Sequence, residues 1–512
     1  MKKIILLIFS LTCILLLASC NIQEQLEQMS DDLKSGIIDV MGPYIEKNTD
    51  TDSDKYSDEV LDNDTGSKPS DIPSDITSDI PSDIPSDTVV DSDSNDTPDE
   101  PTVPDEPVIP DYIVLEREKY PLNKYIGLDI FRVGEKFKDS EYKFRTAYGY
   151  GRYETTLNDL MGANPLTYFK ISGMESSVHV DFDLSSKVED NGNDITFSEI
   201  ASKIHEFAKK YCNNSLTSNL TRIEIGTNPD TKISAKDYAL LLNIIYDNNC
   251  KQNGYDVENP GTTFINPYIR LITGKMSSYN LPYIKELMNE IELARNDDFL
   301  PIGGWSFSVN TEGKSPEEVF LNNQSLKDVI TYRNENYDSI EIILSDFSWD
   351  TVNSESNIYL APNDTYTSEE LQASYILRSF LILQGMGVDK ASYDALNDTE
   401  TQSNGIIDAN GNKKLAFTML EYFKTKMNGA FFKEVIKNGE KNVYCYKFET
   451  EDGKTILALW STDTGYYSIN STADEKIKIS TYDKENLYID TTYQIEGGFT
   501  ITLNQTVTFI EY

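Results

Sequence analysis

The chain has 512 residues, of which 39% are hydrophobic, and a formal net charge of −40 at pH 7. Because contacts with nucleic-acid phosphates require clustered Lys and Arg, this charge argues against nucleic-acid binding. Only two histidines, His179 and His205, are present, so a Ser-His-Asp catalytic apparatus is not expected. The five cysteines have no metal-type spacing, and we expect no disulfide framework, no metal site and no cofactor.

The first twenty residues are typical of an export signal. Lys2 and Lys3 precede an almost unbroken apolar run over residues 4–17, which is too short to remain as a membrane-spanning helix. The following Leu-Ala-Ser-Cys, ending at Cys20, resembles a lipobox, in which the cysteine sulfur is acylated. We therefore expect an exported protein that Cys20 anchors to a bacterial membrane, with its body outside the cell or at the cell surface. An ordinary signal peptide with an incidental cysteine is the alternative.

A short amphipathic segment and a long spacer follow the signal. Apolar residues recur every three or four positions over 21–46, which predicts one amphipathic helix. Residues 47–112 repeat Ser-Asp-Ile-Pro, and 50–111 hold 20 acidic residues against 2 lysines. Frequent proline, charge repulsion and sparse apolar residues predict a disordered, extended linker that holds the body away from the membrane.

The rest of the chain is predicted to form two folded parts. In residues 113–426 short apolar runs alternate with helical patterns, which favours a (β/α)₈ TIM barrel. Its candidate strands are 126–133, 144–148, 166–171, 222–226, 263–265, 300–309, 340–344 and 388–395. Its candidate helices are 197–211, 235–248, 281–294, 368–384 and 414–426. In residues 427–512, runs at 443–449, 456–460, 477–481, 499–503 and 507–512 predict a C-terminal antiparallel β-sandwich.

Three strand ends of the predicted barrel carry polar motifs. They are Glu-Ile-Gly-Thr-Asn-Pro-Asp at 224–230, Trp-Ser-Phe-Ser at 305–308 and Ser-Asp-Phe-Ser-Trp-Asp-Thr at 345–351. Together they resemble strands four, six and seven of the clan-A glycoside hydrolases, closest to β-xylosidases and α-iduronidases. In that group strand four ends Glu-Ile-Gly-Asn-Glu-Pro-Asp and strand seven ends Thr-Glu-Phe-Gly-Trp-Asp-Thr. The resemblance implies a barrel plus sandwich with its active site at the carboxyl ends of the strands.

The resemblance also implies that both catalytic glutamates are replaced. Asn228 aligns with the acid/base and Asp346 with the nucleophile, while Ser308 stands where strand six often has histidine. A retaining glycosidase needs two opposed carboxyl groups. Asn228 has no titratable proton, and Asp346 is one methylene shorter than glutamate. Possible substitute acids are Glu224, Asp230, Asp350 and Glu175, although we interpret Glu224 as structural and Asp230 as the cap of the next helix.

Sugar binding does not require the lost carboxyls. The candidate binding residues at the strand ends are Trp305, Trp349, Arg145, Tyr393, Thr227 and Ser308, with Tyr148 and Tyr150 nearby; core packing is the alternative for each aromatic.

The leading hypothesis is a surface-anchored, catalytically degenerate glycosidase-like protein that binds glycan or acts as an adhesin or scaffold. An active glycosidase with a non-standard acid/base is the alternative. A stalked module that binds host or cell-surface proteins is the third possibility. Asp408–Asn412 is interpreted as a turn, because a calcium loop would need a Glu that is absent.

Overall fold

The computed structural model describes residues 120–131, 149–160, 166, 174–182, 184–185, 188–190, 193–212, 220–252, 270–295, 300–351, 368–399 and 402–512. All belong to one compact unit, Pro101–Tyr512. The predicted signal (1–20), amphipathic helix (21–46) and linker (47–112) lie outside the described residues, so those expectations stay predictions. None of the helices in the described ranges is both long and apolar enough to cross a membrane.

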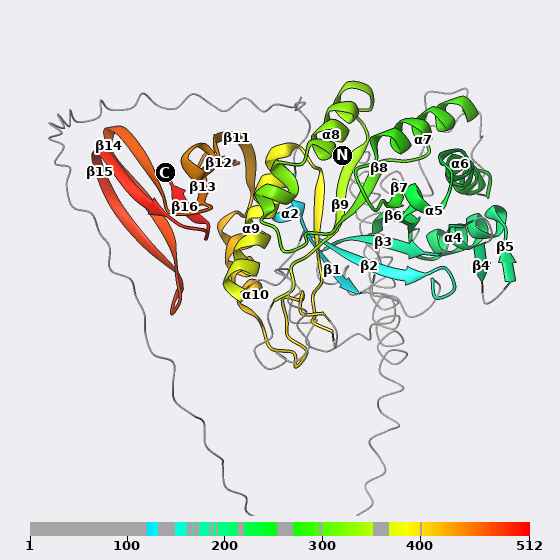
Figure 1. Cartoon of the computed structure of the whole chain (residues 1–512), viewed down its shortest axis with the longest axis horizontal. Helices are drawn as coiled ribbons and strands as arrows, with labels where there is room; N and C mark the ends of the chain where they lie inside the picture. Colours follow the sequence, from blue (N-terminus) through cyan, green and yellow to red (C-terminus); the bar gives the residue numbers. More distant parts are fainter. Residues whose placement is uncertain are drawn as a thin grey trace, which may run out of the picture. The chain divides into compact units, whose positions relative to one another are not determined.

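Eight parallel strands close into a barrel, as the sequence predicted (Figure 1). In ring order they are β1 (Ile126–Phe131), β2 (Tyr150–Thr156), β3 (Glu175–Asp181), β6 (Leu220–Thr227), β7 (Arg270–Lys275), β8 (Gly304–Val309), β9 (Glu341–Phe347) and β10 (Lys390–Asp394). Strand β10 pairs with β1 to complete the ring. A closed parallel barrel gathers the carboxyl ends of all its strands at one rim.

Helices on the outside of the barrel connect the strands. The described ones are α2 (Leu122–Tyr125), α4 (Phe197–Cys212), α5 (Pro229–Lys232), α6 (Ala235–Gln252), α7 (Leu281–Ala294), the π-helix η2 (Glu317–Leu321), α8 (Gln324–Asn336), α9 (Glu369–Met386) and α10 (Leu415–Lys426). Consecutive helices α4, α6, α7 and α8 contact one another in turn. Five of these helices were predicted, whereas α2, α5, α8 and η2 were not. A short hairpin, β4 (Val188–Asp190) and β5 (Asn193–Ile195), precedes α4.

Three barrel strands differ from the prediction. The second, third and fifth strands are β2, β3 and β7. The proposed strands 144–148 and 263–265 lie outside the described residues, and of 166–171 only Leu166 is described. Apolar runs mark the strands that were predicted correctly, whereas β2 and β3 alternate polar with apolar residues. Such strands are typical of a barrel whose interior is polar.

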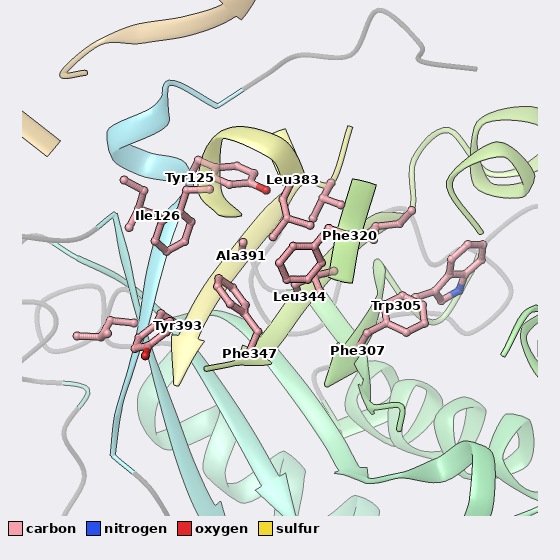
Figure 2. Close-up of a cluster of buried hydrophobic side chains, with 14 of the residues drawn as sticks. Tyr125, Ile126, Trp305, Phe307, Phe320, Leu344, Phe347, Leu383, Ala391 and Tyr393 are labelled. Atoms are coloured by element: carbon pink, nitrogen blue, oxygen red, sulfur yellow. The ribbon is translucent and has the colours of Figure 1, made fainter. Parts of the chain in front are cut away.

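The apolar core lies between the strands and the outer helices (Figure 2). Strand β8 shows the two-residue alternation that creates it. Trp305 points outward, where its ring stacks on Tyr332 of α8 at a centroid distance of 6.1 Å. Ser306 and Ser308 bond instead to carboxylates inside the barrel. Strand β8 therefore presents one apolar face to the helices and one polar face to the interior.

The C-terminal part is one antiparallel sheet that folds over itself as a sandwich, in agreement with the prediction. Its strand order is β11-β12-β13-β16-β14-β15. The bounds are β11 (Ala430–Asn438), β12 (Val443–Thr450), β13 (Thr455–Ser461), β14 (Gly465–Asp483), β15 (Leu487–Leu503) and β16 (Thr508–Glu511), with a 3₁₀ turn η3 (Glu440–Asn442). A separate cluster, which includes Leu457, Leu459, Ile477 and Ile479, fills its interior. Strand β11 was not predicted, and β14 and β15 are longer than expected.

A buried charge joins the barrel to the sandwich. Glu317 on η2 accepts bonds from Nε of Arg378 on α9 at 2.9 Å and from Nε1 of Trp460 on β13 at 2.7 Å. Arg378 also donates through Nη2 to the second carboxylate oxygen. Glu317 and Arg378 are 2% and 1% exposed. Because the pair is desolvated, loss of either partner leaves an uncompensated buried charge.

We expect Glu317→Gln to lower the free energy of unfolding by about 3–5 kcal/mol, measured by chemical denaturation, because Arg378 then remains buried without a counter-ion. Glu312→Gln is the matched control, since Glu312 pairs with Lys314 but both are more than half exposed. The control should unfold like the wild type. Equal stability of all three proteins would contradict the assigned role of the buried pair.

Candidate functional site

The amino ends of the strands are closed by a network of charges. Arg222 on β6 donates to both carboxylate oxygens of Glu341 on β9, at 2.9 and 3.0 Å. Glu175 on β3 contacts both Arg222 and Lys390, each at 3.4 Å. Burial opposes ionisation of Glu341, but Arg222 lowers its pKa to about 2. Glu175 thus lies at the floor of the barrel, opposite the rim, and the expectation that it could replace the catalytic acid is wrong.

The middle of the barrel is organised around Glu224, which is 1% exposed. Arg152 donates to its two oxygens at 3.1 and 3.2 Å. Ser177, Ser306 and Ser345 each donate a hydroxyl at 3.1 Å. Burial raises the pKa of Glu224, but Arg152 and its other partners lower it below the ordinary value. A buried carboxylate held by this many donors is structural, as predicted.

A β-bulge directs Asp346 into the interior. Strand β9 matches β8 at Phe307 and Leu344, but the next pair joins Ser308 to Asp346, so Ser345 has no partner in the register. The pairing of β9 with β10 shifts over the same residues. An extra residue in one strand re-aims the side chains beside it. As a result, Ser345 and Asp346, although adjacent in the sequence, both bond to groups inside the barrel.

Seven side chains at the carboxyl ends of the strands form one connected group, which we call the rim cluster. Its members come from β2, β3, β6, β7, β8 and β9, and they are Glu154, His179, Asp181, Thr227, Lys275, Ser308 and Asp346. Unlike Glu224, three charged members are partly open to solvent, with Glu154 13%, Lys275 16% and Asp346 20% exposed, whereas His179 is 1% exposed. The rim cluster is therefore the polar group that a ligand at this end of the barrel would meet.

Lys275 lies at the centre of the rim cluster. Its Nζ is 2.7 Å from Oε1 of Glu154 and 3.2 Å from Oδ2 of Asp346, and Ser308 donates to the same Asp346 oxygen at 3.2 Å. Burial and Arg152 lower the pKa of Lys275, but the two carboxylates outweigh them and raise it. Burial likewise opposes ionisation of Glu154, while Arg152, His179 and Lys275 hold its pKa well below the ordinary value. Both Lys275 and Glu154 are thus charged at neutral pH.

The other half of the rim cluster links β3 to β6. His179 contacts Glu154 through Nδ1 at 3.1 Å, and through Nε2 the carbonyl of Gly226 at 2.9 Å. Thr227 lies 3.1 Å from the same Nε2 and donates to Asp181 at 2.5 Å. Thr227, predicted as a binding residue, is therefore in the cluster. These contacts fix the orientation of His179, Thr227 and Asp181.

Asn228 follows β6, the fourth strand of the barrel, as the sequence motif predicted. It is partly exposed, and its backbone has φ 53° and ψ 50°. Asn adopts this left-handed conformation more readily than glutamate does. Its backbone N–H donates to the carbonyl of Lys275 at 2.9 Å, and Pro229 begins α5 directly afterwards. The backbone at the acid/base position is thus suited to asparagine.

The aromatic candidates follow the alternative of core packing and not the expectation of sugar binding. Trp305, Trp349 and Tyr393 are at most 1% exposed. Trp305 packs against α8, and Trp349 donates through Nε1 to the carbonyl of Lys314 at 2.8 Å. Tyr393 donates to the carbonyl of Asn404 at 2.8 Å. In this structure the three rings belong to the core and present no open face to a sugar.

Other candidates have structural contacts or are not described. Arg145 and Tyr148 lie outside the described residues, and Tyr150 is 1% exposed. Asp230 accepts bonds from Ser277 and Ser278 after β7. It does not cap α6, because Ser234 accepts from the N–H of Asp237 there. Asp350 accepts from the N–H of Ser403.

Asp408 closes a turn by accepting from the backbone of Asn410 and Asn412, and within the described residues no acidic, histidine or cysteine group is arranged to hold a metal.

Sequence reasoning missed the basic members of the site. Lys275 and Arg152 were not singled out, nor were Glu154 and Asp181. One signal was available, because Arg152 and Glu154 alternate with Gly151 and Tyr153 in a short segment rich in strand-forming residues. Alternating charges of opposite sign on one face of a strand indicate a polar partner surface. No comparable local signal marks Lys275.

This chain has a parallel (β/α)₈ barrel with a polar rim, followed by an antiparallel sandwich, and it shares this fold with solved glycoside hydrolases. It is similar to a family 39 glycoside hydrolase from the gut symbiont Bacteroides cellulosilyticus WH2, with a TM-score of 0.54 and 14% identity over 77% of this chain and 82% of that one. It is also similar to a glucosidase from Croceicoccus marinus, with a TM-score of 0.50 and 11% identity over 72% and 90%. At these identities the likeness concerns the fold alone. No protein-family profile and no curated protein sequence matches the chain.

We expect Lys275→Met to destabilise the protein at pH 7 by about 3 kcal/mol, because Glu154 and Asp346 lose their shared cation. In the wild type the pKa of Glu154 lies below its ordinary value of 4.5. The stability that this ionised carboxylate contributes is present above that pH and is lost as the pH falls further. The deficit of the variant, measured by urea denaturation at several pH values, should therefore shrink below about pH 4.5.

The control for this prediction is Lys484→Met, which removes a lysine that is 75% exposed and pairs with a half-exposed Glu370. It should show no comparable loss at any pH. A deficit of Lys275→Met that is the same at pH 7 and pH 4 would contradict the ionic role of Lys275.

Proposed function

We propose that this protein is a surface-anchored glycan-binding protein with a glycoside hydrolase fold that has lost retaining hydrolysis. The observation that carries the proposal is the pairing of Asp346 with Lys275 in the rim cluster, next to an asparagine at the acid/base position. Retaining hydrolysis requires one carboxylate free to attack and one carboxylic acid able to donate a proton. Asn228 supplies no proton, and Asp346 is neutralised by an ammonium group of the protein itself.

The rim cluster contains one other carboxyl near Asp346, that of Glu154. Its position favours the alternative of an active enzyme. The oxygens of Glu154 and Asp346 that bind Lys275 are no more than about 6 Å apart, close to the roughly 5–5.5 Å of a retaining pair. However, the ammonium of Lys275 lies between them, and Glu154 is held ionised by three basic neighbours. A general acid must carry its proton at the working pH. Glu154 is therefore a poor proton donor, and we favour binding over hydrolysis.

Glycan binding remains feasible without the catalytic pair. Sugar hydroxyls are recognised by a few well-placed polar groups, and the rim cluster supplies hydroxyls from Thr227 and Ser308 with carboxylates from Asp181 and Asp346. Their mutual hydrogen bonds hold them in place before a ligand arrives, which lowers the entropic cost of binding. The glycoside hydrolase fold supports carbohydrate as the class of ligand.

The purified wild type should not release the aryl group from aryl glycosides of common sugars, yet it should bind at least one glycan on an array. Asp346→Asn should weaken that binding by one to two orders of magnitude, measured by calorimetry, because hydrogen bonds to charged groups contribute about 1.5–3 kcal/mol. Glu335→Gln, an exposed change on α8, is the matched control and should bind normally.

Two results would count against this proposal. Turnover by the wild type that disappears in Glu154→Gln would establish the active-glycosidase alternative. A complete array without any hit would favour the third hypothesis, a module that binds host or cell-surface proteins.

The surface location is a separate part of the proposal and depends on Cys20. In bacterial cells that produce the full chain, a labelled fatty acid should be incorporated, and Cys20→Ser should abolish the label and release the protein or leave its precursor uncleaved. Two acyl chains give stable membrane attachment, whereas one alone is marginal. Cys13→Ser, in the same signal segment, is the control and should be labelled normally. Unchanged labelling of Cys20→Ser would refute the anchor.

A further inference from the structure

We infer that strand β15 of the sandwich pairs with β15 of a second copy of this chain, in antiparallel orientation about a two-fold axis at Thr491. The inference concerns the sandwich and is independent of what the rim cluster binds. It follows from an open strand edge, from two exposed apolar side chains beside it, and from the way in which residues 489–493 complement themselves.

Strand β15 forms one end of the sandwich sheet (Figure 1). Among the strands of the described ranges it pairs with β14 alone, and residues 489–493 have no strand on their other side. The backbone N–H and C=O groups on the outer side of an edge strand are a template for a further strand. This side of β15 is therefore able to receive one.

The two ends of the sheet differ in how they are protected. Strand β11, at the other end, carries Lys433 and Lys437 and contacts α2 and α9 of the barrel. Lysine, proline and covering helices are the usual means of blocking an edge. The 17 residues of β15 include no Lys, Arg or Pro. Many of them are Thr, Tyr and Ile, which favour strands. The sequence of β15 thus lacks the common safeguards against edge pairing.

Two exposed apolar side chains lie beside this open edge. Ile489 is 42% exposed and Tyr493 is 38% exposed. Tyr493 is in register with Ile477, which is buried in the interior of the sandwich. Side chains alternate along a strand, so Ile489, four residues from Tyr493, faces the same side. The apolar inner face of the sheet therefore continues to its edge, where burial of these two side chains would favour association.

Residues 489–493 are complementary to themselves. With the two-fold axis at Thr491, Ile489 of each copy lies opposite Tyr493 of the other, and Thr491 meets its own counterpart. Cross-strand pairs of an aromatic with a β-branched residue, and of two threonines, stabilise antiparallel sheets. An axis at Thr492 would set Tyr493 opposite Thr491. It would also set Ile489 opposite Ile495, which is already buried. The axis at Thr491 is thus the one that joins the two exposed apolar residues.

Charge does not oppose this register. Asp490 is the one charged residue in the segment, and it pairs with Lys478 of β14 at 2.5 Å and accepts from Ser480 at 2.6 Å. In the dimer it lies opposite Thr492 of the second copy, so no like charges face each other directly. Whole chains with a formal net charge of −40 repel one another. The second copy is therefore held by backbone hydrogen bonds and apolar contact, and not by net charge.

The direct test is sedimentation velocity of the full chain over a range of concentrations, in a non-ionic detergent that accommodates its apolar N-terminal segment. Pairing of residues 489–493 alone is smaller than a stable interface of roughly 1,200–2,000 Å². We therefore expect a dimer in equilibrium with monomer. The dimer fraction should rise with sodium chloride, because screening weakens the repulsion between two acidic chains.

A substitution on the axis locates the interface. Thr491→Lys should raise the dissociation constant at least about tenfold, because two ammonium groups would face each other at the axis. Thr491 is exposed, so the monomer should tolerate the change, and thermal unfolding followed by circular dichroism checks this. Thr502→Lys is the matched control, since Thr502 is exposed on the same strand outside the paired segment. It should dimerise like the wild type.

Cross-linking tests the axis without adding charge. Thr491→Cys should form a disulfide-linked dimer on mild oxidation, because the residue lies opposite its own counterpart. Thr502→Cys should give no more dimer than the wild type, which measures the background from the cysteines of the chain. This comparison decides the question even if Thr491→Lys does not fold.

Two results would overturn the inference. A wild type that stays monomeric at every concentration and salt level would show that β15 does not pair with its own copy, and would leave the edge to a strand of another protein. A dimer that persists in Thr491→Lys, together with no excess cross-linking of Thr491→Cys, would place the contact on another surface. Neither result bears on glycan binding at the rim cluster.

Discussion

The buried guanidinium of Arg152 determines how the interior of this barrel is organised. A charge that is removed from water is tolerated only when it is paired and hydrogen-bonded. Arg152 meets that condition by bonding to carboxyls on three different strands, at Asp129, Glu154 and Glu224. These bonds join β1, β2 and β6 through the barrel interior. The rim cluster is connected to this pairing through Glu154, which bonds to both Arg152 and Lys275.

The same ion pairs that stabilise the interior also restrict its chemistry. Arg152 and Lys275 keep Glu154 ionised, and Lys275 occupies the space between Glu154 and Asp346. A stable, charge-paired rim is a poor source of protons, because each carboxyl that is well paired has given up the protonated state that a general acid needs. The backbone at Asn228 also favours a residue without a titratable proton, since its left-handed conformation suits asparagine. In the function proposed above, the stability of the rim and the loss of acid catalysis have a common physical cause.

The sequence revealed the fold through local patterns and missed what depends on closure of the ring. The motif around Asn228 and Asp346 predicted the fourth and seventh strands, because Pro229 and the apolar runs mark where strand ends and helix begins. The burial of Trp305 also follows from local alternation, since Ser306 and Ser308 take the inner face. Strands β2 and β3 were missed because their inner faces are polar. The role of Lys275 could not be predicted, as its partners lie 121 and 71 residues away along the chain and meet it only when the barrel closes.

The carboxylate of Glu317 makes the stability of the barrel depend on the presence of the sandwich. It belongs to η2 of the barrel, yet one of its hydrogen bonds comes from Trp460 of the sandwich. A chain that ended at residue 426 would keep the buried Glu317–Arg378 pair but lose the indole that covers and satisfies it. Truncation at the domain boundary should therefore not yield a barrel with native stability. Hinge motion between the two parts would break the same bond, so this bond opposes a change in the angle between barrel and sandwich.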